Sequence, residues 1–141
     1  MSKANDINRQ LRRDILRVYR EVAPHCWYQR DAWEKTVMHP APRFYVTPKQ
    51  AYQKVLPMLD GDFSEIDCMN PRRQRLYACL YQRVLEASEQ VQFAGKSLWF
   101  MMPFIVSQPA PEFFLSTEQL RQIFREEKKK SRKTVKQHGS K

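Results

Sequence analysis

Four arginines near the start of the chain recur at one-turn spacing and could bind phosphate groups. They are Arg9, Arg13, Arg17 and Arg20, separated by four, four and three residues. A guanidinium presents a planar fork of N–H donors that matches phosphate oxygens. Contacts of this kind hold a nucleic-acid backbone without reading its bases. The alternatives are a solvated helix face and ion pairs with a partner protein.

The C-terminal end is a second basic element. Residues 125–141 hold eight basic and two acidic side chains, a net charge of +6, while the whole chain has a net charge of +10. Such uneven charge indicates a polyanionic partner, and DNA or RNA is the commonest one inside cells. The candidate phosphate contacts here are Lys128, Lys129, Lys130, Arg132 and Lys133. The alternative is a tail that only adds solubility.

The arginines lie in a segment whose apolar residues have a helical period. Residues spaced by four, four, three and four predict a helix over residues 5–22, which Pro24 ends. These apolar residues are Ile7, Leu11, Ile15, Val18 and Val22. Two residues correspond to about 200° around a helix. The arginines, each two residues behind an apolar position, should therefore lie opposite the core.

An internal repeat organises the rest of the chain. Residues 40–50 recur as residues 109–119, 69 positions later, with five of eleven positions identical. The match predicts two units, about 1–60 and 70–129, related by pseudo-twofold symmetry. Two units are too few for a solenoid. We therefore expect a single domain over residues 1–130, followed by a basic, disordered tail at 131–141.

Each unit is predicted to contain a long helix, a short apolar helix, an extended segment and a closing helix. Prolines hold the extended segments out of the α region, and these segments are expected to pair as a minimal two-stranded antiparallel ribbon. Thr47 with Gln50, and Ser116 with Gln119, form capping boxes that start the closing helices. The fold class is therefore mainly α. Besides 5–22, the predicted helical segments are 30–38, 48–60, 71–91, 95–106 and 117–130.

The repeat also serves as an internal comparison for function. The positions that match the four arginines in the second unit are Ala78, Gln82, Glu86 and Glu89. The scaffold therefore tolerates a neutral or acidic face, and the arginines are not needed for the fold. Arg43 matches Glu112 in the same way, so we add it to the candidate phosphate contacts.

Several apolar and polar residues have two interpretations. The aromatic residues of the repeats could stack on bases, but their apolar neighbours favour the core. Residues 98–106 are apolar on every side, which indicates either a central buried helix or a homo-oligomer interface. Gln53 and Gln122 are possible base readers if the closing helices belong to a helix-turn-helix. Against that interpretation, the connection before each closing helix is extended and is not a tight turn.

No catalytic or metal-binding pattern is present. The histidines do not share a metal-ligand spacing with cysteines or carboxylates, and no glycine-rich phosphate loop occurs. Three cysteines form no CxxC pair, which favours a reduced, intracellular protein. The N-terminus has no apolar signal region, and the most apolar run is too short to span a bilayer. We expect a cytoplasmic, non-enzymatic protein without cofactor, metal or membrane contact.

Three segments resemble a known but uncharacterised family. The motifs that carry the resemblance are Pro-Ala-Pro-Arg-Phe-Tyr-Val-Thr, Pro-Ala-Pro-Glu-Phe-Phe-Leu-Ser and Arg-Leu-Tyr-Ala-Cys-Leu-Tyr-Gln-Arg-Val. The resemblance spans roughly residues 8–125 and is to small basic proteins from prophages and mobile elements of Bacteroidota. No activity is established for that family. The resemblance therefore implies a mobile-element setting and no catalytic residues.

Together these observations predict a non-enzymatic protein that contacts DNA or RNA phosphates with little sequence specificity. The residues expected to carry the contacts are the four arginines, Arg43 and the C-terminal lysines and arginine named above. The alternative is a structural or adaptor protein, either monomeric or oligomeric, whose basic face binds an acidic protein partner.

Overall fold

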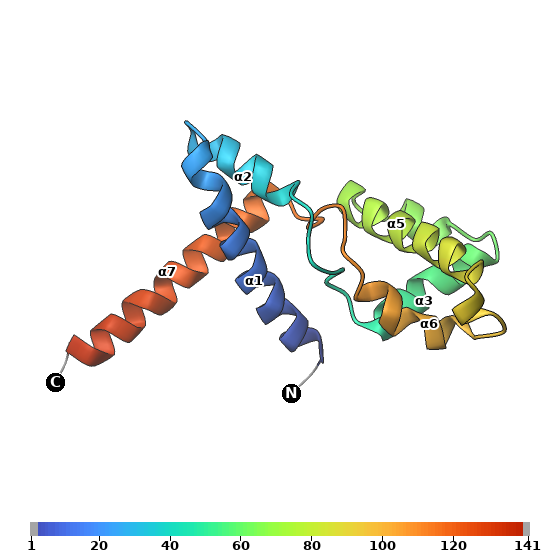
Figure 1. The fold of residues 1–141 in the computed structure, drawn as a ribbon. Coiled ribbons are helices and arrows are strands. Elements are labelled where there is room, and N and C mark those ends of the chain that lie inside the picture. Colours follow the sequence, from blue (N-terminus) through green and yellow to red (C-terminus); the bar gives the residue numbers. More distant parts are fainter. Residues whose placement is uncertain (1–2, 140–141) are drawn as a thin grey trace.

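The chain folds into α-helices joined by short connections (Figure 1). The computed structural model describes the backbone of residues 3–139 and the side chains of residues 6–130. The prediction of a mainly α fold is confirmed. In chain order the helices are α1 (Lys3–Val22), α2 (Gln29–Val37), α3 (Pro48–Leu59), α4 (Ser64–Asp67), α5 (Pro71–Ser88), α6 (Leu98–Val106) and α7 (Thr117–Gly139).

Side-chain caps start the two closing helices, α3 and α7, where the sequence places them. The Thr47 hydroxyl accepts a hydrogen bond from the Gln50 amide at 3.0 Å, and the Gln50 side chain accepts one from the Thr47 amide at 3.2 Å. Ser116 and Gln119 make the same two bonds at 3.1 and 3.0 Å. Both predicted capping boxes are confirmed. They could be predicted from the sequence because a cap depends on residues close together in the chain and not on tertiary packing.

The helices form two lobes, and each lobe combines helices from both halves of the sequence (Figure 1). Helices α1, α2 and α7 pack together as the first lobe, and α3, α5 and α6 pack together as the second lobe. Helix α3, from the first half of the sequence, packs on α5 and α6 of the second half. Helix α7, from the second half, packs on α1 and α2 of the first half. This exchange means that neither half of the sequence builds a lobe by itself.

Two extended connections, residues 38–47 and 107–116, run past each other between the lobes. Ala41 and Ala110 exchange backbone hydrogen bonds of 2.9 and 2.8 Å as an isolated antiparallel bridge. Within residues 3–139 no strand forms, so the expected two-stranded ribbon is reduced to this bridge. A ladder cannot extend from it, because proline has no N–H to donate. The flanking prolines are Pro40, Pro42, Pro109 and Pro111.

A second pair of backbone bonds holds each connection to a helix end of the other half. The Phe44 amide donates to the Val106 carbonyl at 2.9 Å, and the Phe113 amide donates to the Val37 carbonyl at 3.2 Å. Both donors precede a closing helix and both acceptors end a short helix. The crossing of the two connections is therefore fixed on both sides of the bridge.

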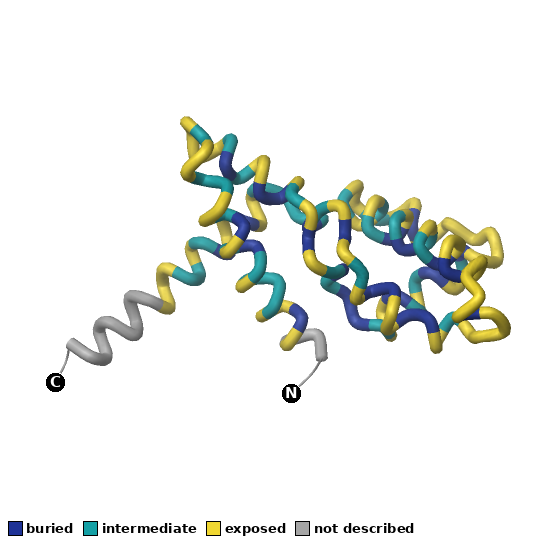
Figure 2. Tube along the Cα trace, in the orientation of Figure 1, coloured by how far each residue is buried: buried dark blue, intermediate teal, exposed yellow. Residues whose placement is uncertain are grey.

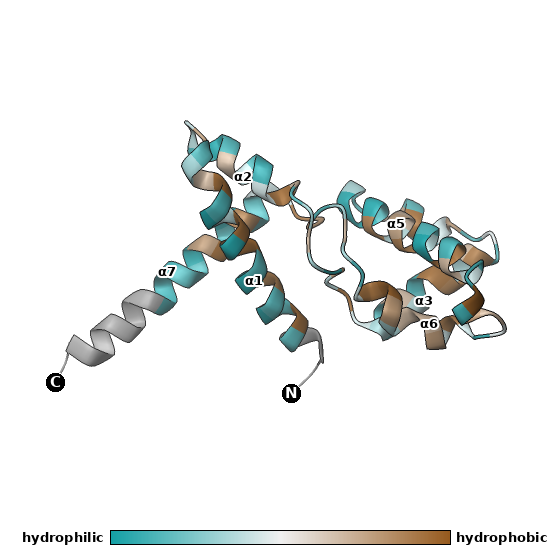
Figure 3. Cartoon of the chain, viewed as in Figure 1, coloured by the Kyte–Doolittle hydropathy of each residue, from teal (hydrophilic) through white to brown (hydrophobic). Residues whose placement is uncertain are grey.

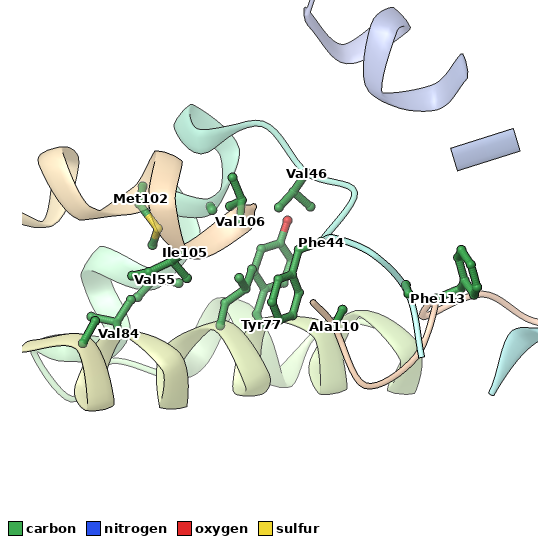
Figure 4. Close-up of a cluster of buried hydrophobic side chains, with 14 of the residues drawn as sticks. Phe44, Val46, Val55, Tyr77, Val84, Met102, Ile105, Val106, Ala110 and Phe113 are labelled. Atoms are coloured by element: carbon green, nitrogen blue, oxygen red, sulfur yellow. The ribbon is translucent and has the colours of Figure 1, made fainter. Parts of the chain in front are cut away.

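The core is largest in the second lobe, where α3, α5 and α6 face one another (Figure 2). Phe44 is fully buried and lies alongside Tyr77 of α5 (Figure 4). The aromatic residues thus divide in two. Phe44 and Phe113 are buried as expected, but the same expectation is wrong for Trp99 and Phe100 of α6, which are 54% and 44% exposed.

Helix α6 is hydrophobic along its length, in contrast to the polar faces of α1 and α7 (Figure 3). It buries Met101, Met102, Ile105 and Val106 against α3 and α5. Its other face leaves aromatic side chains exposed. Sequence periodicity could not assign the two faces, because every position carries an apolar residue.

Candidate nucleic-acid interface

The arginine stripe lies on the solvent side of α1. Ile15 and Val18 are buried on the inner face of α1, while all four arginines are exposed. Among the described side chains, none of the four has a hydrogen-bond or ion-pair partner, so their donors are available to an anion. The members of the arginine stripe are Arg9, Arg13, Arg17 and Arg20.

Helix α7 crosses α1 on the flank of this stripe (Figure 1). Tyr19 and Phe124 meet edge to face with ring centroids 4.5 Å apart. Arg12 forms an ion pair with Glu126. Hydrogen bonds from Gln122 and Arg12 hold the pKa of the Glu126 carboxyl below its ordinary value. These contacts set the register of α7 along α1.

A groove of about 300 Å³ lies between the two crossing helices, and we call it the basic groove. Glu127 contributes one acidic side chain and is within 3.7 Å of Lys130. Cations therefore outnumber acids along the walls, which gives the groove a positive potential. Its lining residues are Arg9, Arg12, Arg13, Leu16, Arg20, Glu127 and Lys130.

The exchange of closing helices concentrates charge in one lobe. The segments 3–37 and 117–139, which include the first lobe, carry 16 basic and 8 acidic residues, a net charge of +8. The segment 48–106, which includes the second lobe, carries 7 basic and 6 acidic residues, a net charge of +1. Two basic segments from opposite ends of the sequence thus reach the same side of the molecule.

The C-terminal candidates are only partly described. Lys128, Lys129 and Lys130 are exposed on α7, and Lys130 lines the basic groove. The helix was expected to end near Lys130, but it continues to Gly139, consistent with the absence of proline or glycine before that residue. The side chains of Arg132 and Lys133 lie outside the described residues.

Arg43 is held against α1 and lies outside the basic groove. Its Nε donates to the Phe44 carbonyl at 3.0 Å, and its Nη1 donates to the Gln10 side chain at 3.3 Å. The side chain is half-buried. These bonds give Arg43 a role in positioning α1 on the connection between the lobes, beside any contact with phosphate.

Sequence reasoning missed Arg121 and Arg125, which follow one face of α7 together with Lys128. The residues 69 positions earlier are Tyr52, Leu56 and Leu59 of α3, which are uncharged. The comparison that identified the arginine stripe could have found this face as well. Cations surround most of α7, however, so no single stripe marks these residues.

Tyr45 ties the first connection to α1. Its hydroxyl donates a 2.6 Å hydrogen bond to the Asp14 carboxylate. Burial and this carboxylate hold the pKa of Tyr45 above its ordinary value, because both disfavour the phenolate. The neutral hydroxyl is therefore the form that the folded chain stabilises.

Replacing Tyr45 with phenylalanine is expected to lower the free energy of unfolding by about 1–2 kcal/mol, because a half-buried carboxylate loses its donor. The raised pKa means that Tyr45 contributes this stability below about pH 10 and loses it as the pH rises further. The gap between wild type and Tyr45→Phe should then narrow above that pH. Urea unfolding over a pH series measures it. Tyr52→Phe is the matched control, and an equal loss in both variants would contradict the assignment.

Other chemistry finds little support among the described residues. No group of three or more His, Cys, Asp or Glu side chains comes together there in a way that could hold a metal ion. Burial raises the pKa of the Cys79 thiol, which disfavours the reactive thiolate. Across the same residues, no helix has the length and apolar content needed to cross a membrane.

The helix-turn-helix interpretation gains no support from the glutamines. The Gln50 and Gln119 side chains serve the helix caps. Gln122 donates to Glu126 at 3.3 Å, and Gln53 is exposed on α3. Helix α3 packs on α5 and α6, and α7 packs on α1 and α2, so neither closing helix packs mainly on the short helix that precedes it.

No protein-family model matches this chain, and no curated protein or solved structure matches it. The geometry and charge of the first lobe are therefore the basis for a functional proposal.

Proposed function

We propose that this protein is a non-enzymatic nucleic-acid-binding protein that contacts the phosphate backbone of DNA or RNA with little sequence specificity. The arginine stripe of α1 and the lysines of α7 make the contacts. Arg43 positions α1 beside them. The chain would serve as an accessory protein rather than as a catalyst.

The observation that supports this proposal most is the convergence of α1 and α7 in the first lobe. The two most basic segments are far apart in sequence, yet they cross and line one groove. Bringing like charges together raises electrostatic repulsion within the folded chain. A polyanion seated along the groove relieves that repulsion. A merely solvated surface does not require such an arrangement.

The spacing of the arginine stripe suits a backbone contact. From Arg9 to Arg20 the helix rises about 16 Å, at about 1.5 Å per residue. One strand of a duplex places a phosphate every 3.4 Å or so along the axis. Several phosphates therefore fall within reach of the stripe. Guanidiniums without described partners can follow such a row without contacting base edges.

We also propose that the chain is a duplicated unit in which the two halves exchange closing helices. Helix α6 begins and ends 69 residues after α2, and α7 begins 69 residues after α3. The hydrogen bonds that the Phe44 and Phe113 amides donate are related by the same offset of 69 residues. The arrangement supports a single domain over residues 1–130, because neither half forms a lobe without the other.

The wild-type protein is expected to bind a random-sequence duplex and a single strand at low salt. The logarithm of the affinity should fall linearly with the logarithm of salt concentration, with a slope of about −0.9 per phosphate contact on a duplex. Retention on immobilised DNA and RNA at rising salt measures this. A duplex of unrelated sequence should bind within a few-fold. No retention at low salt would contradict the proposal.

An adaptor or oligomer is the second candidate, and the exposed face of α6 favours it. Trp99, Phe100 and Phe104 are 54%, 44% and 53% exposed on one helix. Exposed aromatic groups of this kind are common at protein interfaces. The basic first lobe would then bind an acidic protein partner. Sedimentation with and without nucleic acid separates the two candidates. A self-associated form that does not bind nucleic acid would favour the adaptor or oligomer.

The setting of the protein is a proposal as well. The resemblance of its repeated proline and aromatic motifs to the Bacteroidota family suggests a prophage or mobile element. Cysteines outside any disulfide are compatible with the expected cytoplasmic location.

A further inference from the structure

A second hollow, of about 220 Å³, lies between α2 and α7, and we call it the Trp33 pocket. It shares no lining residue with the basic groove. Three of its residues are cations and none is acidic. The lining residues are Gln29, Trp33, Arg121, Phe124, Arg125 and Lys128.

The three cations of the pocket lie outside the ion pairs of the described residues. Among the described residues, Arg121, Arg125 and Lys128 form no ion pair. The Arg121 guanidinium lies over the Trp33 ring, 5.0 Å from its centroid. Stacking uses the flat face of a guanidinium and leaves the N–H donors at its edge. Arg121 is thus oriented by the protein while its donors stay available.

Trp33 contributes an independent sign of a missing acceptor. Its indole Nε1 is buried and has no hydrogen-bond partner among the described residues. More than about 90% of buried polar groups find a partner in folded proteins. Because this atom has almost no accessible surface, an oxyanion beside Arg121 reaches it only if the indole or the Arg121 side chain shifts.

The second lobe shows that the fold does not need these residues. At the offset of 69, Trp33 matches Met102 of α6 and Arg121 matches Tyr52 of α3. Arg125 and Lys128 match Leu56 and Leu59 in the same way. The same packing of a short helix on a closing helix is therefore built without a cation. Arg121 stacks on Trp33, whereas Arg125 and Lys128 make no ion pair among the described residues.

We propose that the Trp33 pocket binds a phosphate monoester. A monoester carries about −1.5 to −2 charges near pH 7, which suits three cations better than the single charge of an internal phosphodiester. On a nucleic acid the group is a terminal phosphate, and this assignment rests on the proposed function. A free phosphate-bearing compound has the same chemistry, so the test separates the two sources.

Trp33 itself provides the readout. Replacing Trp27 and Trp99 with phenylalanine, at positions 97% and 54% exposed, leaves Trp33 as the only fluorophore of its type. We expect its emission to change on titration with inorganic phosphate. A 5′-phosphorylated oligonucleotide should act at about tenfold lower concentration than the same strand with a 5′-hydroxyl, the equivalent of about 1.4 kcal/mol.

Variants locate the response. Arg125→Ala with Lys128→Ala leaves the Arg121 stack intact and should abolish the preference for the phosphorylated strand. Lys96→Ala is the matched control, because Lys96 lies 5.1 Å from the centroid of the exposed Phe100 ring in the second lobe. It should leave the titration unchanged. Circular dichroism confirms that each variant keeps its helices.

The outcomes separate this inference from the proposed function. Emission that responds to inorganic phosphate but equally to both strands assigns the pocket to free phosphate compounds. If the strands bind the protein but Trp33 emission changes neither with them nor with inorganic phosphate, the pocket is not a phosphate site. The proposed function is then unaffected. Equal responses to both strands, with none to phosphate, overturn the monoester assignment.

Discussion

Alanine at all four positions of the arginine stripe is expected to weaken binding to a random-sequence duplex by about a thousandfold or more at low salt, because each lost phosphate contact forfeits its counterion release. The slope of log affinity against log salt should become shallower by about 3.6, or 0.9 for each of four contacts. Fluorescence anisotropy of a labelled duplex at several salt concentrations measures both quantities.

The folded state should tolerate these changes. The four side chains are exposed and have no described partner. Alanine has the highest helix propensity, and its substitution removes like charges spaced one turn apart. The thermal midpoint is therefore expected to stay the same or to rise slightly. A fall in affinity can then be assigned to lost contacts and not to unfolding.

A matched control tests whether position matters or only net charge. Alanine at four cations of the second lobe removes the same charge from residues that do not line the basic groove. These residues are Lys49, Arg72, Arg73 and Lys96. We expect this variant to lose only a few-fold in affinity and little of the salt slope. If the two quadruple variants weaken binding equally, the first lobe is not the binding surface.

The sequence predicted those features that depend on neighbouring residues. The exposure of the arginine stripe follows from its offset to the apolar positions of α1. The capping boxes at Thr47 and Ser116 follow from residue types three positions apart. In each case a few residues along one helix decide the outcome, so no knowledge of tertiary contacts was needed.

The exchange of closing helices could not be predicted in this way. Ala51 and Val55 give α3 a buried face, and Leu120 and Ile123 give α7 one. A pattern of apolar residues shows which side of a helix is buried but not which helices cover it. Either closing helix could pack on either half. The Trp33 pocket was missed for the same reason, because it exists only where α7 meets α2.

Phe44→Ala is expected to have the largest effect on stability. The side chain is fully buried in the connection between the lobes, and its amide is bonded to Val106 at 2.9 Å. The Arg83 guanidinium lies 5.6 Å from the ring centroid, and the ring of Phe114 lies 6.2 Å away. Truncation of a buried phenylalanine leaves a cavity and costs about 3–5 kcal/mol. Phe63→Ala, at a position 40% exposed, is the control and should cost under about 1 kcal/mol.

The way in which Phe44→Ala unfolds tests the exchange itself. Each lobe holds a helix from the other half, so neither lobe can lose its closing helix without disturbing the crossing connections. Trp33 reports on the first lobe and Trp99 on the second, when each is the only tryptophan left. In Phe44→Ala the urea midpoints reported by the two tryptophans should fall by the same amount and remain equal to each other. Separate midpoints, with only the Trp99 signal shifted, would show that the lobes fold independently and that the exchanged helices do not couple them.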